Sequence, residues 1–224
     1  LSFAKEYTLP GFPKLPDLKD KGDLTAGWQS SDCCAIEESG AYGNINVTND
    51  LTINIGKENI EIVADSLSVT GNGRILVNRN GNGRLILYVT DQLKLAGSGE
   101  VNPCGNYDDV FIYYGGEGPL NFDGNTKLSG SLFAEKADVA LAGSGVVAGH
   151  IVTGGHRINL SGNAQEDARV IYAPEAVLTV AGSRSVQGTV IARSLELSGS
   201  AQIQYDPSMD PGFLKQLDWQ QGAQ

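Results

Sequence analysis

The sequence predicts an all-β fold: a single-stranded parallel β-helix, or β-solenoid, with an N-terminal extended strap and a short C-terminal capping helix. Three observations predict this fold. A short motif recurs seven times between residues 67 and 200. Each copy joins a strand-like stretch to a glycine corner. Glycine is abundant, at 29 of 224 residues, without the Gly-X-Y period of collagen. Because parallel crossovers are almost always right-handed, we expect a right-handed coil.

The recurring motif reads apolar-x-apolar-x-Gly-[Asn/Ser], as in SLSVTGNG and DVALAGSG. Apolar residues two positions apart lie on one face of a strand, and a glycine with positive φ turns the corner. Successive glycines are 17 to 27 residues apart, which suits one coil of a solenoid. We expect the residues after the glycines to stack into a hydrogen-bonded ladder. The predicted corner and ladder residues are Gly71, Asn72, Gly97, Ser98, Gly124, Asn125, Gly143, Ser144, Gly162, Asn163, Gly182, Ser183, Gly199 and Ser200.

A second strand is predicted in each of the later coils, where β-branched runs such as LFAE, IVTG, VIYAP and VIARS occur. Nine residues after the glycine stand Phe133, Val152, Ile171 and Ile191, and we expect this column to stack inward. With strands about 4.8 Å apart, roughly seven to nine coils would make a rod roughly 35–45 Å long.

The ends of a solenoid need caps, because each end exposes an edge strand. Residues 1–40 lack the motif and carry three prolines among apolar residues, so they predict an extended strap before a solenoid at 41–206. The expected anchors of the strap are Phe12, Leu15 and Trp28.

The C-terminal stretch 207–224 predicts a short capping helix and a tail. Asp210 would be the N-cap and Pro211 the first helical residue. Phe213, Leu214 and Leu217 then share one face, which we expect to cover the last coil.

The charge balance excludes nucleic acid as a partner. The net charge is −10 and the pI about 4.6, so no basic face displaces counterions from a polyanion. No run of eighteen apolar residues occurs, so we expect no direct membrane insertion by this segment. Because the chain begins at Leu1, we expect that a preceding segment has been removed.

The cysteines and histidines predict little chemistry. The three cysteines allow one disulfide, from Cys104 to Cys33 or Cys34, and equally allow reduced thiols. His150 and His156 are interpreted as solvent-facing turn residues, so no metal is assigned and no cofactor is expected.

The best candidate binding surface is the loop that lengthens one early coil. It contains Tyr107, Asp108 and Asp109, and Tyr113 and Tyr114 follow. Asp108 and Asp109, together with Glu117 and Asp123, are also the candidates for a carbohydrate-active or calcium site. No paired acid and base can be inferred from their spacing, so we predict no catalytic residues and no enzyme.

Three stretches resemble a known family: LILYVTDQLKLAGSGEVN, GSLFAEKADVALAGSGVVAGHIVTGG and VIYAPEAVLTVAGSRSVQGTVIARSLELSGSAQIQYD. They are similar to the β-helical C-terminal domain of PilX-type pilus-assembly proteins, the type IV minor-pilin-like proteins of bacteria. The resemblance covers residues 40–206, and SGSAQIQYDPS is its most specific part. It implies an anchoring N-terminal helix outside this chain and no catalytic residues.

These observations favour a non-enzymatic structural or adhesive domain, extracellular or at the cell surface, associated with a type IV-like pilus. Its expected partners are other pilus or cell-surface proteins and a surface glycan. One alternative is a self-assembling, filament-forming scaffold of the bactofilin kind. A second alternative is a carbohydrate-binding or carbohydrate-active β-helix.

Overall fold

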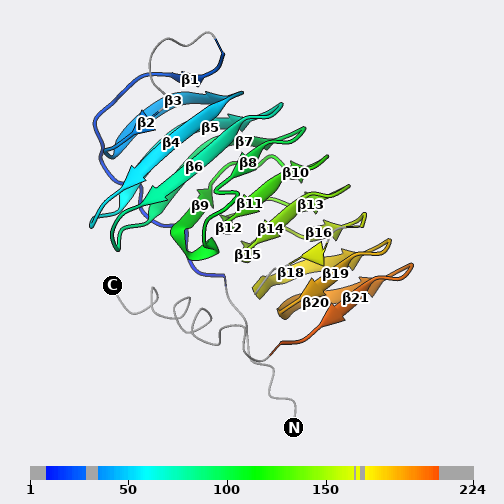
Figure 1. The fold of residues 1–224 in the computed structure, drawn as a ribbon. Coiled ribbons are helices and arrows are strands. Elements are labelled where there is room, and N and C mark those ends of the chain that lie inside the picture. The colour runs from blue at the N-terminus through cyan, green and yellow to red at the C-terminus, as the bar shows by residue number, and fades with distance from the viewer. Residues whose placement is uncertain (1–8, 29–34, 164, 167–169, 207–224) are drawn as a thin grey trace.

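The computed structural model describes residues 9–28, 35–163, 165–166 and 170–206, and these form a parallel β-solenoid of about eight turns (Figure 1). The predicted fold class is confirmed, since every strand pairing is parallel. The one helical element among the described residues is a 3-10 turn, η1 (Tyr107–Asp109). No helix of the described residues is long and apolar enough to cross a membrane. The capping helix expected at 207–224 lies outside the described residues.

Each turn of the solenoid contributes to three faces, and the longest strands bend from one face onto another. The third face precedes the first along each long strand: β7, for example, pairs with β9 through its N-terminal half and with β10 at its C-terminal end. The first face contains β1 (Leu24–Ala26), β10 (Leu120–Phe122), β13 (Val139–Leu141), β16 (Arg157–Leu160) and the C-terminal parts of β3 (Gly40–Val47), β5 (Ile60–Val69), β7 (Leu85–Leu95), β18 (Val170–Val180) and β20 (Thr189–Leu197). The second face contains β2 (Ala35–Ile36), β4 (Asp50–Ile55), β6 (Arg74–Arg79), β8 (Glu100–Val101), β11 (Lys127–Ser129), β14 (Val146–Ala148), β17 (Gln165–Glu166), β19 (Ser185–Gln187) and β21 (Gln202–Gln204). The third face contains β9 (Val110–Tyr114), β12 (Ser131–Ala134), β15 (His150–Thr153) and the N-terminal parts of β3, β5, β7, β18 and β20.

The predicted glycine corner is confirmed between the first and second faces. All seven motif glycines have positive φ, from 64° at Gly71 to 103° at Gly162. The ladder is made by backbone groups: the amide of Ser98 donates to the carbonyl of Gly71 at 2.7 Å, and the same step repeats up to Ser200 and Gly182 at 2.8 Å. The small residues therefore let each corner lie directly on the one before it.

The apolar columns four and two residues before each glycine form the part of the core that lies under the first face. In the first six copies every member is buried, as Leu120 and Val180 are at 0 % exposure. The last copy is the exception, because Leu195 is 48 % and Leu197 is 51 % exposed. Burial in the core thus follows stacking, and the last coil has no coil stacked on it among the described residues.

The column predicted nine residues after each glycine is wrong in two respects: one of its members is different, and its side chains point outward instead of inward. Phe133 pairs with Val152, which pairs with Tyr172 and not with Ile171. The coil between Gly162 and Gly182 has twenty residues, one more than the two coils before it, and this shifts the register. Ile171 instead points into the main core with Leu132 and Ile151, while the column Phe133, Val152 and Tyr172 faces outward in a separate apolar cluster.

The strap covers this outward column. Residues 9–19 run extended along the third face, opposite to the direction of stacking (Figure 1). Where the strap meets the first coils, the amide of Lys21 donates to the carbonyl of Ala41 in β3 at 2.8 Å. Further along, the ring of Phe12 packs against Phe133 with centroids 6.1 Å apart, and Leu9 reaches Gly154.

The boundaries of the strap differ from those expected. The solenoid begins at Leu24 and not at residue 41, because β1 pairs with β3 and β2 with β4. Phe12 is confirmed as an anchor, but Leu15 and Trp28 are 40 % and 88 % exposed and anchor nothing.

Candidate binding groove

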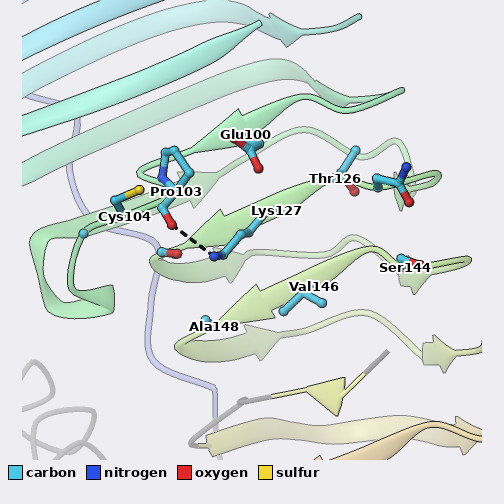
Figure 2. Close-up of a pocket in the computed structure, with 11 residues that line it drawn as sticks. Glu100, Pro103, Cys104, Thr126, Lys127, Ser144, Val146 and Ala148 are labelled. Atoms are coloured by element: carbon cyan, nitrogen blue, oxygen red, sulfur yellow. Dashed lines mark hydrogen bonds between the residues drawn. The ribbon is translucent and has the colours of Figure 1, made fainter. Parts of the chain in front are cut away.

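A groove of about 480 Å³ lies on the second face, between the β8, β11 and β14 strands and the loop after β8 (Figure 2). Its side chains are mostly polar. Glu100 and Lys127 lie on its floor, Cys104 lies at its loop side and Ser144 at its corner side. Glu100 is the one carboxylate among the lining residues, so the groove does not hold the pair of carboxylates that glycoside hydrolysis requires.

The loop that borders the groove is held by side chains from several coils. Asn102 adopts a positive φ of 53° and is 2 % exposed. Its Nδ2 donates to the carbonyl oxygens of Asn106 at 3.0 Å and Ser129 at 3.1 Å. Lys127 Nζ donates to the carbonyl of Pro103 at 3.0 Å, as Figure 2 shows. The loop is therefore a defined wall of the groove.

The η1 turn completes the loop. Asn106 caps it, and the Oδ2 atom of Asp109 accepts a hydrogen bond from the Asn106 amide at 3.2 Å. The Oδ1 atom of Asp109 forms an ion pair with Arg79 of β6. Asp109 is thus 8 % exposed and links two coils.

The floor of the groove continues a column of alternating charge. Asp50, Arg74, Glu100 and Lys127 are successive partners across β4, β6, β8 and β11. Arg74 binds Asp50 through two hydrogen bonds of 2.8 and 2.6 Å. These hydrogen bonds lower the pKa of Asp50 against the opposing effect of burial. Opposite charges at neighbouring positions favour this strand register, although solvent screens each exposed pair.

The five predicted binding residues do not share one surface. Tyr107 packs edge-on against His150, with ring centroids 5.8 Å apart. Asp108 lies beside Asp109 in the η1 turn. Tyr113 stacks between Tyr88 and Phe133 under the strap, at 5.4 and 5.6 Å.

Tyr114 points the opposite way from Tyr113, into the core, and is 2 % exposed. Its hydroxyl lies 3.1 Å from the carbonyl of Asp91 and 3.2 Å from that of Gly118. Burial raises the pKa of Tyr113 and Tyr114, and it raises the pKa of Tyr88 to about 12. These tyrosines stay neutral and serve packing.

The other predicted chemistry is dispersed as well. Asp123 lines a second groove of about 550 Å³ with Asp91 and Lys94, on the first face, while Glu117 is exposed. No group of three or more metal-ligating side chains occurs among the described residues. Cys104 carries a free, exposed thiol, and Cys33 and Cys34 lie outside the described residues.

The interpretation of His150 as a solvent-facing turn residue is wrong, whereas His156 is exposed as expected. His150 lies in β15 and is 2 % exposed. The strand extends one residue earlier than the β-branched run suggests, and the η1 turn covers the imidazole through Tyr107.

Sequence reasoning missed Arg184, which is 0 % exposed. It occupies the position two after the glycine, where Gly73, Gly99 and Gly145 stand in other coils. Its guanidinium donates to the carbonyl oxygens of Ser161, at 2.8 Å, and Gly145. The available signal was an arginine at a position that is glycine in three other coils. The space that those glycines leave lets the Arg184 side chain extend inward.

Asp109→Asn is expected to lower the free energy of unfolding by about 1–2 kcal/mol, because it removes the charge that pairs with Arg79 in a partly buried site. The adjacent Asp108→Asn is the matched control, and we expect it to stay within about 0.5 kcal/mol of the parent. Urea unfolding followed by circular dichroism measures both. Equal losses in the two variants would show that the ion pair with Arg79 does not hold the loop.

Asp138 should make the free energy of unfolding depend on pH in the acid range. Its Oδ1 accepts hydrogen bonds from the amides of His156 and Arg157 at 2.8 and 2.9 Å, and its Oδ2 accepts from Arg157 Nε at 3.0 Å. Burial raises the pKa of Asp138, but these hydrogen bonds outweigh it and the net pKa is lowered. Because the folded pKa lies below the unfolded one, the stabilisation is complete above about pH 4–5 and is lost as the pH falls through the folded pKa.

The measurement is the unfolding free energy of the parent and of Asp138→Asn across this acid range. We expect a gap of about 1 kcal/mol near neutral pH that closes in acid. Asp17→Asn, at an exposed strap position, should change neither value. A gap that persists unchanged in acid would assign the loss to packing.

The fold and the groove define the class of protein: a parallel β-solenoid with an N-terminal strap packed along one face and a polar groove on another. The chain belongs to the family described as Domain of unknown function (DUF7305), whose model matches residues 14–169. The match begins in the strap and covers the solenoid through β17. No curated protein and no solved structure matches the chain.

Proposed function

We propose that this chain is a non-enzymatic structural and adhesive domain displayed outside the bacterial cell, as part of a type IV-like pilus or beside one. The observation that carries the proposal is the use made of its reactive side chains. Asp109 pairs with Arg79, Tyr113 stacks under the strap, and the Tyr114 hydroxyl contacts two backbone carbonyls. Groups that could act on a substrate stabilise the rod instead.

The rod supports a role in display. Parallel stacking along three faces and a strap that crosses several coils make one continuous element (Figure 1). The acidic composition keeps such an exposed surface soluble and repels polyanions. The sequence resemblance to minor-pilin-like β-helical domains supplies the pilus as the setting.

The partner surface that we favour is the groove on the second face. Glu100 and Lys127 offer a hydrogen-bond acceptor and a donor on its floor. The loop that forms its wall, which includes Pro103, is fixed in place by hydrogen bonds from Asn102 and Lys127. Such a polar, preformed groove suits a pilus or cell-surface protein or the hydroxyls of a surface glycan.

Immunogold electron microscopy of the native cells, with an antibody raised against this chain, tests the proposal. We expect label on filaments or on the cell surface. A knockout strain provides the control for antibody specificity. Label confined to the cytoplasm would overturn both the pilus and the adhesive role.

A self-assembling scaffold is the second candidate, because the last coil leaves Leu195 and Leu197 about half exposed. Stacked coils of two copies could then continue one sheet. Light scattering over a wide concentration range distinguishes the two: a scaffold lengthens as concentration rises, whereas a displayed domain keeps one mass.

A further inference from the structure

The last coil of the solenoid ends in an apolar surface. Leu195 and Leu197 continue the columns of Leu178 and Val180, which are 0 % exposed one coil earlier. Tyr205 follows β21 and is 68 % exposed. In the described part of the chain, these three are the large apolar side chains that stand open at this end of the rod.

The backbone at this end is also unpaired on one side. β20 pairs with β18, and β21 pairs with β19, each through one edge. Among the described residues no strand lies along the other edge of either. Unpaired backbone groups along the edge of β20, beside two half-exposed leucines, can pair with a strand of another chain. A solenoid therefore needs a cap at this end.

The chain itself supplies a candidate for that cap. It leaves the last coil at Asp206, and residues 207–224 follow. Phe213, Leu214 and Leu217 lie at helical spacing behind the Asp210-Pro211 start signal. Three residues connect Asp206 to Asp210, and these four Cα-to-Cα steps span at most about 14 Å, which keeps the apolar residues next to this surface.

Tethering favours this occupant over a second copy. A short linker gives an effective concentration in the millimolar range, whereas a second copy competes only at its concentration in solution. We propose that the surface formed by Leu195 and Leu197 is the docking site for the chain's own residues 207–224, and that the docked segment keeps a second copy off the open edge of β20.

Tryptophan fluorescence tests the docking. The chain has two tryptophans, so Trp28→Phe leaves Trp219 as the single reporter within the docking segment. In this background we expect Leu195→Ser with Leu197→Ser to raise the acrylamide quenching constant of Trp219 at least twofold. Glu196→Ser lies between the two leucines and faces the other side of the strand, so it serves as the matched control and should change nothing. Unchanged quenching in the leucine variant would overturn the docking.

Light scattering of the 224-residue chain tests whether the docked segment keeps a second copy away. We expect the parent to stay monomeric from micromolar to near-millimolar concentration. Phe213→Ser with Leu217→Ser should release the edge and double the apparent mass at high concentration, and adding the two leucine changes should restore the monomer. A parent that dimerises through Leu195 and Leu197 would show that the occupant is a second copy. A released variant that remains monomeric would overturn the protective role.

Discussion

Gly162→Ala is expected to lower the free energy of unfolding by about 3–5 kcal/mol, because it combines backbone strain with a backbone clash. Gly162 has a φ of 103°, which an L side chain rarely adopts. An alanine Cβ there would lie 2.1 Å from the carbonyl oxygen of Gly143 in the preceding coil. Neither backbone can move away alone, since the Asn163 amide donates to the same carbonyl.

Gly71→Ala separates the two causes. Gly71 has a φ of 64°, but a Cβ at this corner would meet no atom within 4 Å. We expect a loss of about 1–2 kcal/mol, the strain term alone. Chemical denaturation followed by circular dichroism measures both variants. If the two losses were equal, close stacking of the corners would contribute nothing, and the glycine would recur from coil to coil for its turn conformation only.

The corner could be predicted from the sequence because its causes are local. Apolar residues at alternate positions and a glycine with Asn or Ser after it specify a strand and a turn without reference to other coils. The motif is absent from the first two coils. β1 and β3 keep the alternating apolar residues, Leu24 with Ala26 and Ile45 with Val47, but Trp28 and Asn49 stand where the later coils have the motif glycine.

What depends on contacts between coils could not be predicted. One extra residue between Gly162 and Gly182 shifts the register, so that Tyr172 and not Ile171 stands in the outward column. The sequence of that coil alone does not show where the shift occurs. The outward column is apolar because Phe12 and Leu9 of a distant segment cover it. A strand with apolar residues on both faces indicates burial on both, and that signal was present in LFAE and VIYAP.

The candidate groove shows the same division. Its loop was recognisable from the longer spacing and its polar residues, and it does border the groove. The floor was missed, because Glu100 and Lys127 come from different coils and meet only through strand register. The alternating charges three residues after Gly71, Gly97 and Gly124 were the available signal.

Phe12→Ala is the second large effect: we expect a loss of about 2–4 kcal/mol. The Phe12 ring packs edge-on against Tyr113 and tilted against Phe133, both at 6.1 Å between centroids, and so bridges β9 and β12. Leu15→Ala is the matched control on the same strap, because Leu15 is 40 % exposed, and its expected loss is within about 0.5 kcal/mol.

The strap should also govern cooperativity. In a solenoid each coil contacts only its neighbours, so distant coils unfold together only as far as nearest-neighbour coupling extends. The strap breaks this rule by joining Ala41 of β3 to Gly154 after β15 through one extended segment. Phe12→Ala is therefore expected to lower the urea m-value and to raise hydrogen exchange in β9 and β12 more than in β4 and β6. A uniform increase in exchange along the rod would mean that the strap adds stability without coupling the coils.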